Sequence, residues 1–308
     1  MKAAEVRTVA EPPVAPGNAR SGLSARLRAW FELSKPGITR MIVIATAAAF
    51  YMGSGDSLDF ILLVHTIIGT TLASSGANAM NQWAERNADA RMRRTKRRPI
   101  PSGRLSSREG FLVSAGMAVA GVAYLQIFVN SMAALLVALS FASYIFVYTP
   151  LKRRSWTATV VGAFPGALPA LAGWCAAGQP INVAGLTIFG ILFLWQMPHF
   201  YALAWMFRDD YRDGGFKLLT VIDNTGRRAA RQSLLYTAVL LPVSLLPTLL
   251  GLTGGLYFAG ALLLSTAFLL ASGRFFRRPQ DGARPLFLGS IAYLPLLYLL
   301  LVIDKTAL

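Results

Sequence analysis

The chain has 308 residues, of which 55% are hydrophobic and only 14% are charged, whereas soluble domains carry roughly 25% charged residues. This composition excludes both an ordinary water-soluble enzyme and a disordered chain. The net charge of +16 is typical of a membrane protein with basic loops, and the one cysteine and two histidines exclude an internal disulfide and a histidine-rich metal site.

Nine apolar runs follow one another along the chain. They are continuous and lack the period-two alternation of barrel strands, so they predict transmembrane helices. The runs cover residues 38–54, 59–80, 110–129, 132–149, 158–178, 183–206, 233–252, 256–272 and 285–303. We therefore predict an all-α polytopic membrane protein with nine transmembrane helices in residues 34–308. Residues 1–33 are expected to form a mobile cytoplasmic tail, without a secretory signal peptide.

Basic residues gather in alternate connections between these runs. Seven lie in the segment through Arg40, nine in 86–108, three in 152–154, six in 208–231 and four in 274–284. The other four connections carry none, and Lys305 alone falls at the opposite end. The positive-inside rule then places the N-terminus and the basic loops in the cytoplasm and the C-terminus outside. Because the charge is spread among loops between apolar helices, it indicates a bilayer and not a nucleic-acid partner.

The second helix ends in a polar face. Asn81, Glu85 and Asp89 are four residues apart, and each step of four advances a helix by about 400° and 6 Å, so the three side chains share one face. Oxygen ligands of this kind suit Mg²⁺, and the basic run that follows, with Arg94 and Arg98, suits a diphosphate. The alternative is a solvated helix end in which the carboxylates pair with those arginines.

A second acidic cluster, RDDYRDGG, follows the sixth helix and contains Asp209, Asp210 and Asp213. Its members three or four residues apart face one way if the segment is helical. The alternative is an interhelical loop with local Asp–Arg pairs. Because both acidic clusters lie on the predicted cytoplasmic side, we expect them to flank a single magnesium diphosphate.

Further candidates lie close to these clusters. His199 stands near the cytoplasmic end of the sixth helix, where it is either a hydrogen-bonded packing residue or, as an ionisable group at depth, a functional one. The loop YTPLKR contributes Tyr148, Lys152 and Arg153, either as substrate contacts or as membrane anchors. Nearby aromatic residues either line an apolar slot or pack between helices: Trp195, Phe200, Tyr201 and Trp205. The fifth helix reads GAFPGALPALAG, whose small residues permit close helix packing.

Several of these segments together resemble a known family. NQWAERNADARMRRTKRRP contains Asn-x-x-x-Glu-x-x-x-Asp and resembles the first signature of the UbiA superfamily of intramembrane prenyltransferases. Its trailing M-x-R-T-x-x-R-P is similar to the branch of that superfamily that farnesylates haem. YTPLKR, GALPALAGW, WQMPHFYALAWMFRDDYRDGG and SIAYLPLL resemble the same branch in the same order. The resemblance covers most of residues 35–303 and implies nine helices around a central cavity.

The resemblance also implies an activity, which is transfer of a farnesyl group from farnesyl diphosphate to a vinyl group of haem B. The products are haem O and diphosphate, and Mg²⁺ is the implied cofactor. Asn81, Glu85 and Asp89 would hold Mg²⁺ and diphosphate, and His199 would face the haem. The implied contacts to the diphosphate are Arg94, Arg98, Lys152 and Arg153, with Asp210 on the second metal side, Asp209 or Asp213 assisting, and Tyr148 in the substrate-binding set. The implied location is the bacterial cytoplasmic membrane, with haem A synthase or an oxidase-assembly protein as a partner.

The chain also departs from that branch. Ala158 stands where Asn is frequent, and Ala170 stands where a second proline is common. The second acidic motif is not the full paired-aspartate form of the quinone-pathway members, which argues against a quinone-type acceptor. The alternatives are a UbiA-type enzyme that acts on a quinone or chlorin precursor and a secondary transporter. A transporter is disfavoured because transporter ion sites tend to lie near the bilayer midplane, whereas these acids cluster at one face.

Overall fold

The computed structural model describes residues 22–55 and 57–306, and this described part is built from helices. Nine helices within it are long and apolar enough to cross a membrane. They are α2 (Pro36–Gly53), α3 (Phe60–Asp89), α4 (Ser107–Phe128), the composite of α5 (Ser131–Ala142), η1 (Ser143–Tyr148) and α6 (Thr149–Leu151), α7 (Ala158–Ala176), α8 (Val183–Met206), α11 (Arg227–Leu249), α12 (Gly255–Arg277) and α13 (Pro279–Ile303). The predicted all-α, nine-helix membrane fold is thus confirmed.

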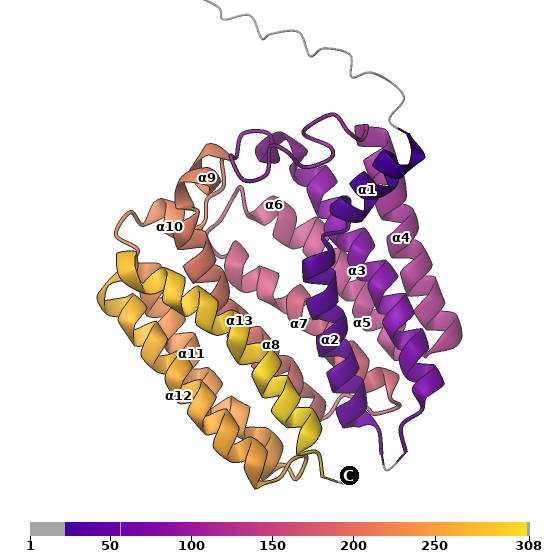
Figure 1. The fold of residues 1–308 in the computed structure, drawn as a ribbon, viewed down its shortest axis with the longest axis vertical. Helices are drawn as coiled ribbons and strands as arrows, with labels where there is room; N and C mark the ends of the chain where they lie inside the picture. Colours follow the sequence, from indigo (N-terminus) through magenta and orange to yellow (C-terminus); the bar gives the residue numbers. More distant parts are fainter. Residues whose placement is uncertain (1–21, 56, 307–308) are drawn as a thin grey trace, which may run out of the picture.

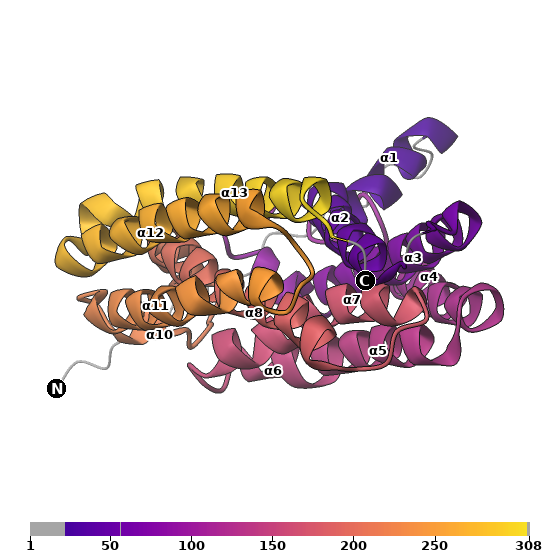
Figure 2. The same cartoon turned by 90° about the horizontal axis from the view of Figure 1, so that it is seen from below.

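The helices pack as two groups that lie side by side (Figure 2). In the first group α3 packs on α4, while α2 and α5 pack on α7; in the second, α11 packs on α8 and α12, and α12 packs on α13. Contacts between α7 and α8, and between α2 and α13, join the two groups. Eight of the nine spans in the described residues bury one face and leave apolar side chains outward, as contact with lipid requires, whereas α7 is mostly buried among its neighbours.

The two ends of the bundle differ in what they carry. The loop after α3, the short helices α1 (Leu23–Leu33), α9 (Arg208–Asp213) and α10 (Leu219–Ile222), and α6 all lie at one end, and the end of α13 lies at the other (Figure 1). This first end is the one that carries the basic loops. We call it the basic end.

Helices at the basic end run past the apolar segments that predicted them. α3 continues to Asp89 instead of residue 80, and α13 begins at Pro279 instead of residue 285. Hydropathy marks where a helix meets lipid, whereas backbone hydrogen bonding continues wherever the following residues tolerate a helix. The extension of α3 has a functional consequence, because it holds the predicted metal-binding face on a rigid helix.

Part of the expected tail is helical. Leu23–Leu33 forms α1, with Ala29 and Leu33 buried, so the predicted boundary between a mobile tail and the helical domain differs from the structure. Arg104 donates to both Glu32 oxygens, at 2.7 and 2.9 Å, and holds α1 to the loop after α3. Residues 1–21 of that expected tail lie outside the described residues.

Candidate active site

Asn81, Glu85 and Asp89 lie on the last turns of α3 and are all buried, with exposed fractions of 2%, 5% and 0%. The helix is fixed at its start by Asp59, whose carboxylate accepts a hydrogen bond from the Leu62 N–H at 2.9 Å. It then runs unbroken to Asp89, so the spacing of four becomes one continuous polar face. Buried carboxylates are costly unless cations or hydrogen-bond donors compensate them.

Asn81 connects two segments that are distant in sequence. The Lys35 Nζ donates to Asn81 Oδ1 at 2.8 Å, and Asn81 Nδ2 donates to Thr149 Oγ1 at 3.2 Å. Lys35 has φ 50° and is the one non-glycine residue with positive φ among the described residues. A side chain holds this left-handed conformation only where its surroundings enforce it, as they do at many functional sites. Lys35 and Thr149 are site residues that sequence reasoning missed, because a lysine ahead of a transmembrane helix is indistinguishable from a membrane anchor.

The two carboxylates of α3 pair with cations from the following loops. Lys152 forms an ion pair with Glu85, and Arg98 Nη1 lies 2.7 Å from Asp89 Oδ2. The second Asp89 oxygen, Oδ1, is buried and has no hydrogen-bond donor. A buried oxygen that accepts no hydrogen bond can bind a cation instead, so Asp89 Oδ1 is suited to be a ligand of a metal ion.

Burial and charge act together on the two lysines of the site. Burial, followed by the neighbouring Arg98 charge, lowers the pKa of Lys35 to about 7. Burial is the largest single influence on Lys152 and lowers its pKa, but the Glu85 carboxylate together with Tyr148 and Tyr144 outweighs burial, and the pKa is raised. Lys152 is therefore a permanent cation in this cluster.

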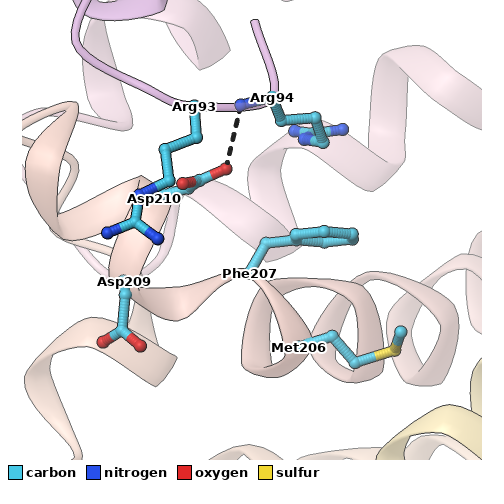
Figure 3. A pocket seen from close by; sticks show the side chains of 6 residues that line it. All are labelled: Arg93, Arg94, Met206, Phe207, Asp209 and Asp210. Atoms are coloured by element: carbon cyan, nitrogen blue, oxygen red, sulfur yellow. Dashed lines mark hydrogen bonds between the residues drawn. The ribbon is translucent and has the colours of Figure 1, made fainter.

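The second acidic cluster lies on α9, and one of its members faces the loop after α3. Asp210 Oδ2 accepts from the Arg94 backbone N–H at 3.3 Å, and the Arg94 guanidinium lies over the Phe207 ring (Figure 3). Asp209 instead pairs with Arg212 at 2.6 Å on the surface, and Asp213 is exposed. A pocket of about 370 Å³ opens here between the loop and α8–α9, lined by Arg93, Arg94, Met206, Phe207, Asp209 and Asp210.

Backbone contacts tie the basic loops together. Arg91 Nη2 donates to the Gly214 carbonyl at 2.9 Å, and the Lys217 N–H donates to the Lys152 carbonyl at 2.8 Å. Within the described residues, no three acidic, histidine or cysteine side chains come close enough to share a metal ion. A metal on this face would therefore combine Asn81, Glu85 and Asp89 oxygens with those of a substrate.

The other candidates in the loop YTPLKR occupy different environments. Tyr148 ends the π-helix η1, a form often found at functional sites, and its ring lies 4.6 Å from the Lys152 Nζ. It also stacks on Tyr144, with centroids 5.3 Å apart. Arg153 is exposed to solvent beside them. The structure thus places Tyr148 in the cluster and Arg153 at its rim.

His199 lies at an interface between α8 and α13. Its Nδ1 is 2.7 Å from Ser290 Oγ, and its ring stacks on Trp195 at 5.1 Å and packs against Phe287 at 5.0 Å. These contacts come from α8 and α13 and not from the acidic face of α3. Two of the expected slot residues, Tyr201 and Trp205, are almost fully buried among core side chains and therefore pack between helices.

A bundle of membrane-length helices with a buried carboxylate and cation cluster at one end defines a multi-pass membrane protein with a charged site at its basic end. Residues 42–296 match the sequence profile of the UbiA prenyltransferase family. A relative from Solibacter usitatus, a protoheme IX farnesyltransferase, is 42% identical over 292 residues, which cover 92% of this chain and 100% of the relative. The chain belongs to the UbiA prenyltransferase family and is a prenyltransferase.

Solved structures share the fold. A digeranylgeranylglyceryl phosphate synthase superposes with a TM-score of 0.76 at 15% identity, covering 91% of this chain and 98% of that one. A UbiA homolog from Archaeoglobus fulgidus bound to GPP and Mg²⁺ gives a TM-score of 0.64 at 14% identity, covering 89% of this chain and 99% of that one. At these identities the likeness extends to the architecture of the bundle.

Proposed function

We propose that this prenyltransferase moves a farnesyl group from farnesyl diphosphate to a vinyl group of haem B and forms haem O and diphosphate. The observation that carries the proposal is the buried face of Asn81, Glu85 and Asp89, surrounded by lysines and arginines. The farnesyl donor and haem acceptor are supported by the Solibacter usitatus relative, named for protoheme IX farnesyl transfer. The structural neighbour bound to GPP and Mg²⁺ supports a prenyl diphosphate and a divalent metal.

The metal in this proposal is Mg²⁺, held by Asn81, Glu85 and Asp89. The Asp89 Oδ1, buried without a donor, supports this assignment. Asp210 would serve the opposite side of the diphosphate, next to the Arg94 backbone. Bound Mg²⁺ would stabilise the negative charge that develops on the leaving diphosphate.

Basic side chains of the protein would also stabilise the negative charge of the diphosphate. Arg94, Arg98 and Lys152 would contact phosphate oxygens, and Arg153 at the rim would draw the diphosphate in. Arg98 and Lys152 now neutralise Asp89 and Glu85, so a diphosphate with its metal would exchange one set of ion pairs for another. Preorganised charges of this kind need little rearrangement during reaction.

The proposed reaction needs no covalent intermediate with the protein. The bond between the allylic carbon and the diphosphate oxygen breaks, and diphosphate leaves with the electron pair. The terminal vinyl carbon forms the new carbon–carbon bond, and the positive charge moves to the carbon beside the porphyrin ring. Water adds at that carbon and loses a proton, which gives the hydroxyethylfarnesyl chain. A site surrounded by packed helices keeps bulk water from the allylic cation until the new bond forms.

On the acceptor side we assign His199 and its aromatic neighbours to haem. Trp195, Phe200 and Phe287 surround the imidazole with flat apolar surfaces, and a porphyrin is itself flat and apolar. The proposal also includes the bacterial cytoplasmic membrane, with the basic end in the cytoplasm. It includes haem A synthase or an oxidase-assembly protein as the partner, because an apolar haem product is best handed on within the membrane.

The direct test is an assay of the purified full chain with haem B, farnesyl diphosphate and Mg²⁺, followed by mass analysis of the haem. We expect a haem that has gained one farnesyl group and one hydroxyl group, and no product when a chelator replaces Mg²⁺. Prenylation of a hydroxybenzoate or naphthoate, with haem left unchanged, would contradict the acceptor.

The His199→Ala variant tests the acceptor site separately. Haem turnover should fall sharply, while binding of labelled farnesyl diphosphate stays near the wild-type level, because the α3 face is untouched. His65→Ala is the matched control, since His65 bonds Tyr124 between α3 and α4 and should leave haem turnover intact. Normal haem turnover in His199→Ala would remove His199 from the acceptor site.

A further inference from the structure

The short helix α1 presents a stripe of large apolar side chains away from the protein. Leu23, Leu27 and Phe31 are spaced by four residues and are 72%, 51% and 66% exposed. The opposite face carries Ala29 and Leu33, which are buried against the loop after α3. The helix is therefore amphipathic, although it is not one of the nine membrane spans.

Ion pairs fix how α1 is rotated. Arg26 Nη2 lies 2.7 Å from Glu109 Oε1 at the start of α4, and the Trp30 indole N–H donates to the same oxygen at 3.0 Å. On the other side, Glu32 is held by Arg104. With both sides fastened, α1 cannot roll to bury its stripe. Figure 2 shows α1 projecting sideways beyond α2, α3 and α4.

Exposed apolar side chains also lie near the starts of the two spans next to α1. Ile38 at the start of α2 is 52% exposed, and Leu112 near the start of α4 is 57% exposed. Outward apolar faces of spanning helices contact lipid. The stripe on α1 thus lies beside the level at which these spans leave the bilayer.

Basic side chains stand at the same level. Arg28 and Arg108 are exposed and form no ion pair within the described residues. A pocket of about 330 Å³ between α1 and α4 is lined by polar residues at the start of α4 and apolar ones a turn later along it: Arg26, Trp30, Ser106, Arg108, Glu109, Leu112 and Val113. Its one carboxylate, Glu109, is already paired with Arg26. A lipid phosphate and the start of an acyl chain match this order of groups.

We propose that α1 is an interfacial helix that binds the anionic lipid surface at the basic end of the bundle. Leu23, Leu27 and Phe31 enter the boundary between headgroups and acyl chains, and Arg28 and Arg108 contact lipid phosphates. The turn from Ser34 to Lys35 joins α1 to α2, so lipid contact with α1 also holds the Lys35 end of the polar site. This binding surface is independent of which acceptor the site uses.

The insertion of the stripe is tested with single labels on the full chain in lipid nanodiscs. In a Cys175→Ala background, Leu27→Cys and Phe31→Cys each carry an environment-sensitive fluorophore, and Ala25→Cys, on another exposed side of α1, is the matched control. The nanodiscs contain phosphatidylcholine with or without phosphatidylglycerol. We expect blue-shifted emission at positions 27 and 31, quenched by shallow spin-labelled lipids, and water-like emission at position 25.

Two results would overturn the insertion. Water-like emission at positions 27 and 31 would show that the stripe does not meet lipid. Blue-shifted emission that spin-labelled lipids do not quench would assign the stripe to a protein partner or a second copy of this chain.

The anionic preference is tested by native mass spectrometry of phosphatidylglycerol retained by the full chain. Combined Arg28→Gln and Arg108→Gln should lower the retained lipid at least twofold. Arg277→Gln, which removes another exposed arginine at the basic end, should leave it unchanged. Equal retention in the double variant and wild type would contradict the assignment to anionic lipid.

Discussion

Asp89 is the most tightly constrained side chain of the polar site. It is fully buried, one oxygen pairs with Arg98, and the other has no donor. The backbone carbonyl of the same residue accepts from Thr95 Oγ1 at 3.0 Å, which fixes the turn after α3. A carboxylate so placed is held rigidly with unused capacity to bind a cation.

Substitution of Asp89 by Asn keeps its size and removes its charge. We expect Asp89→Asn to lower prenyl transfer by ~100-fold or more, because stabilisation of the leaving diphosphate is the main catalytic contribution of this face. Turnover with farnesyl diphosphate and haem B, measured beside a folding check by size-exclusion chromatography, gives the result. Asp281→Asn is the control, because this exposed carboxylate at the start of α13 forms no ion pair within the described residues and lies outside the site. Near-normal turnover in Asp89→Asn would return the α3 face to a structural role.

For individual residues, the sequence predicted which side chains share a helix face better than it predicted which residues they contact. The period of four placed Asn81, Glu85 and Asp89 on one face, because a helix repeats locally. The alternative to a metal site was a solvated helix end whose carboxylates pair with basic residues. Glu85 and Asp89 do form such pairs, with Lys152 and Arg98, but both carboxylates are buried. The contact from Lys35 was missed, because it depends on how two distant segments pack. Asp209 follows the local Asp–Arg alternative, while Asp210 faces the loop after α3.

The close packing of α7 against its neighbours depends on its glycines, which have no side chain. A Cβ added at Gly173 would lie 2.1 Å from the Thr46 carbonyl oxygen of α2, and one at Gly162 would lie 2.4 Å from the Tyr148 ring. The small residues of this helix were expected to permit close packing, and these contacts show it. α7 thereby brings α2, with Lys35 at its start, and Tyr148 together around the polar site.

Gly173→Ala tests this packing. Because the contact is with backbone, α2 and α7 must separate, and overpacking of this kind costs about 1–3 kcal/mol. The control is Gly116→Ala on α4, where an added Cβ meets nothing within 4 Å. Both substitutions replace glycine by alanine inside a helix and gain the same helix propensity. The difference between their unfolding midpoints therefore reports the contact between α2 and α7. Thermal unfolding in detergent should show a lower midpoint for Gly173→Ala only. Equal midpoints would show that α2 and α7 accommodate the added methyl group without loss of stability.

Element boundaries were harder to predict than element number. The nine apolar runs each correspond to a spanning helix, because a bilayer demands a continuous apolar segment. The polar ends of α3 and α13 were missed, since hydropathy does not report helices that leave the membrane. α1 was missed for a different reason, which is that its burial depends on packing against distant segments that contain Ala79, Ile100 and Leu105.

Charge divides the whole molecule into two ends. The basic loops, α6, α9 and the polar site share one end, while the described C-terminal residues lie at the other (Figure 1). Lys305 is the exception, and its ammonium donates to the Tyr51 carbonyl at 2.8 Å near the end of α2. A cation at the C-terminus of a helix is favourable. Lys305 therefore has a local structural partner and does not weaken the charge asymmetry.

The asymmetry predicts that the basic end, with the polar site, faces the cytoplasm. In a Cys175→Ala background, Ser102→Cys lies in the exposed loop after α3, and Ser131→Cys lies at the exposed start of α5, at the other end. An impermeant thiol reagent should label position 102 only in inside-out vesicles and position 131 only in right-side-out vesicles. Permeabilised membranes, in which both positions should react, control for accessibility. Reversed labelling would invert the orientation, whereas labelling of both positions from one side would contradict the passage of α4 through the bilayer. Cytoplasmic labelling at position 102 would place the arginine-rich loop, and the entrance for a charged diphosphate, on the side where soluble prenyl diphosphates are available.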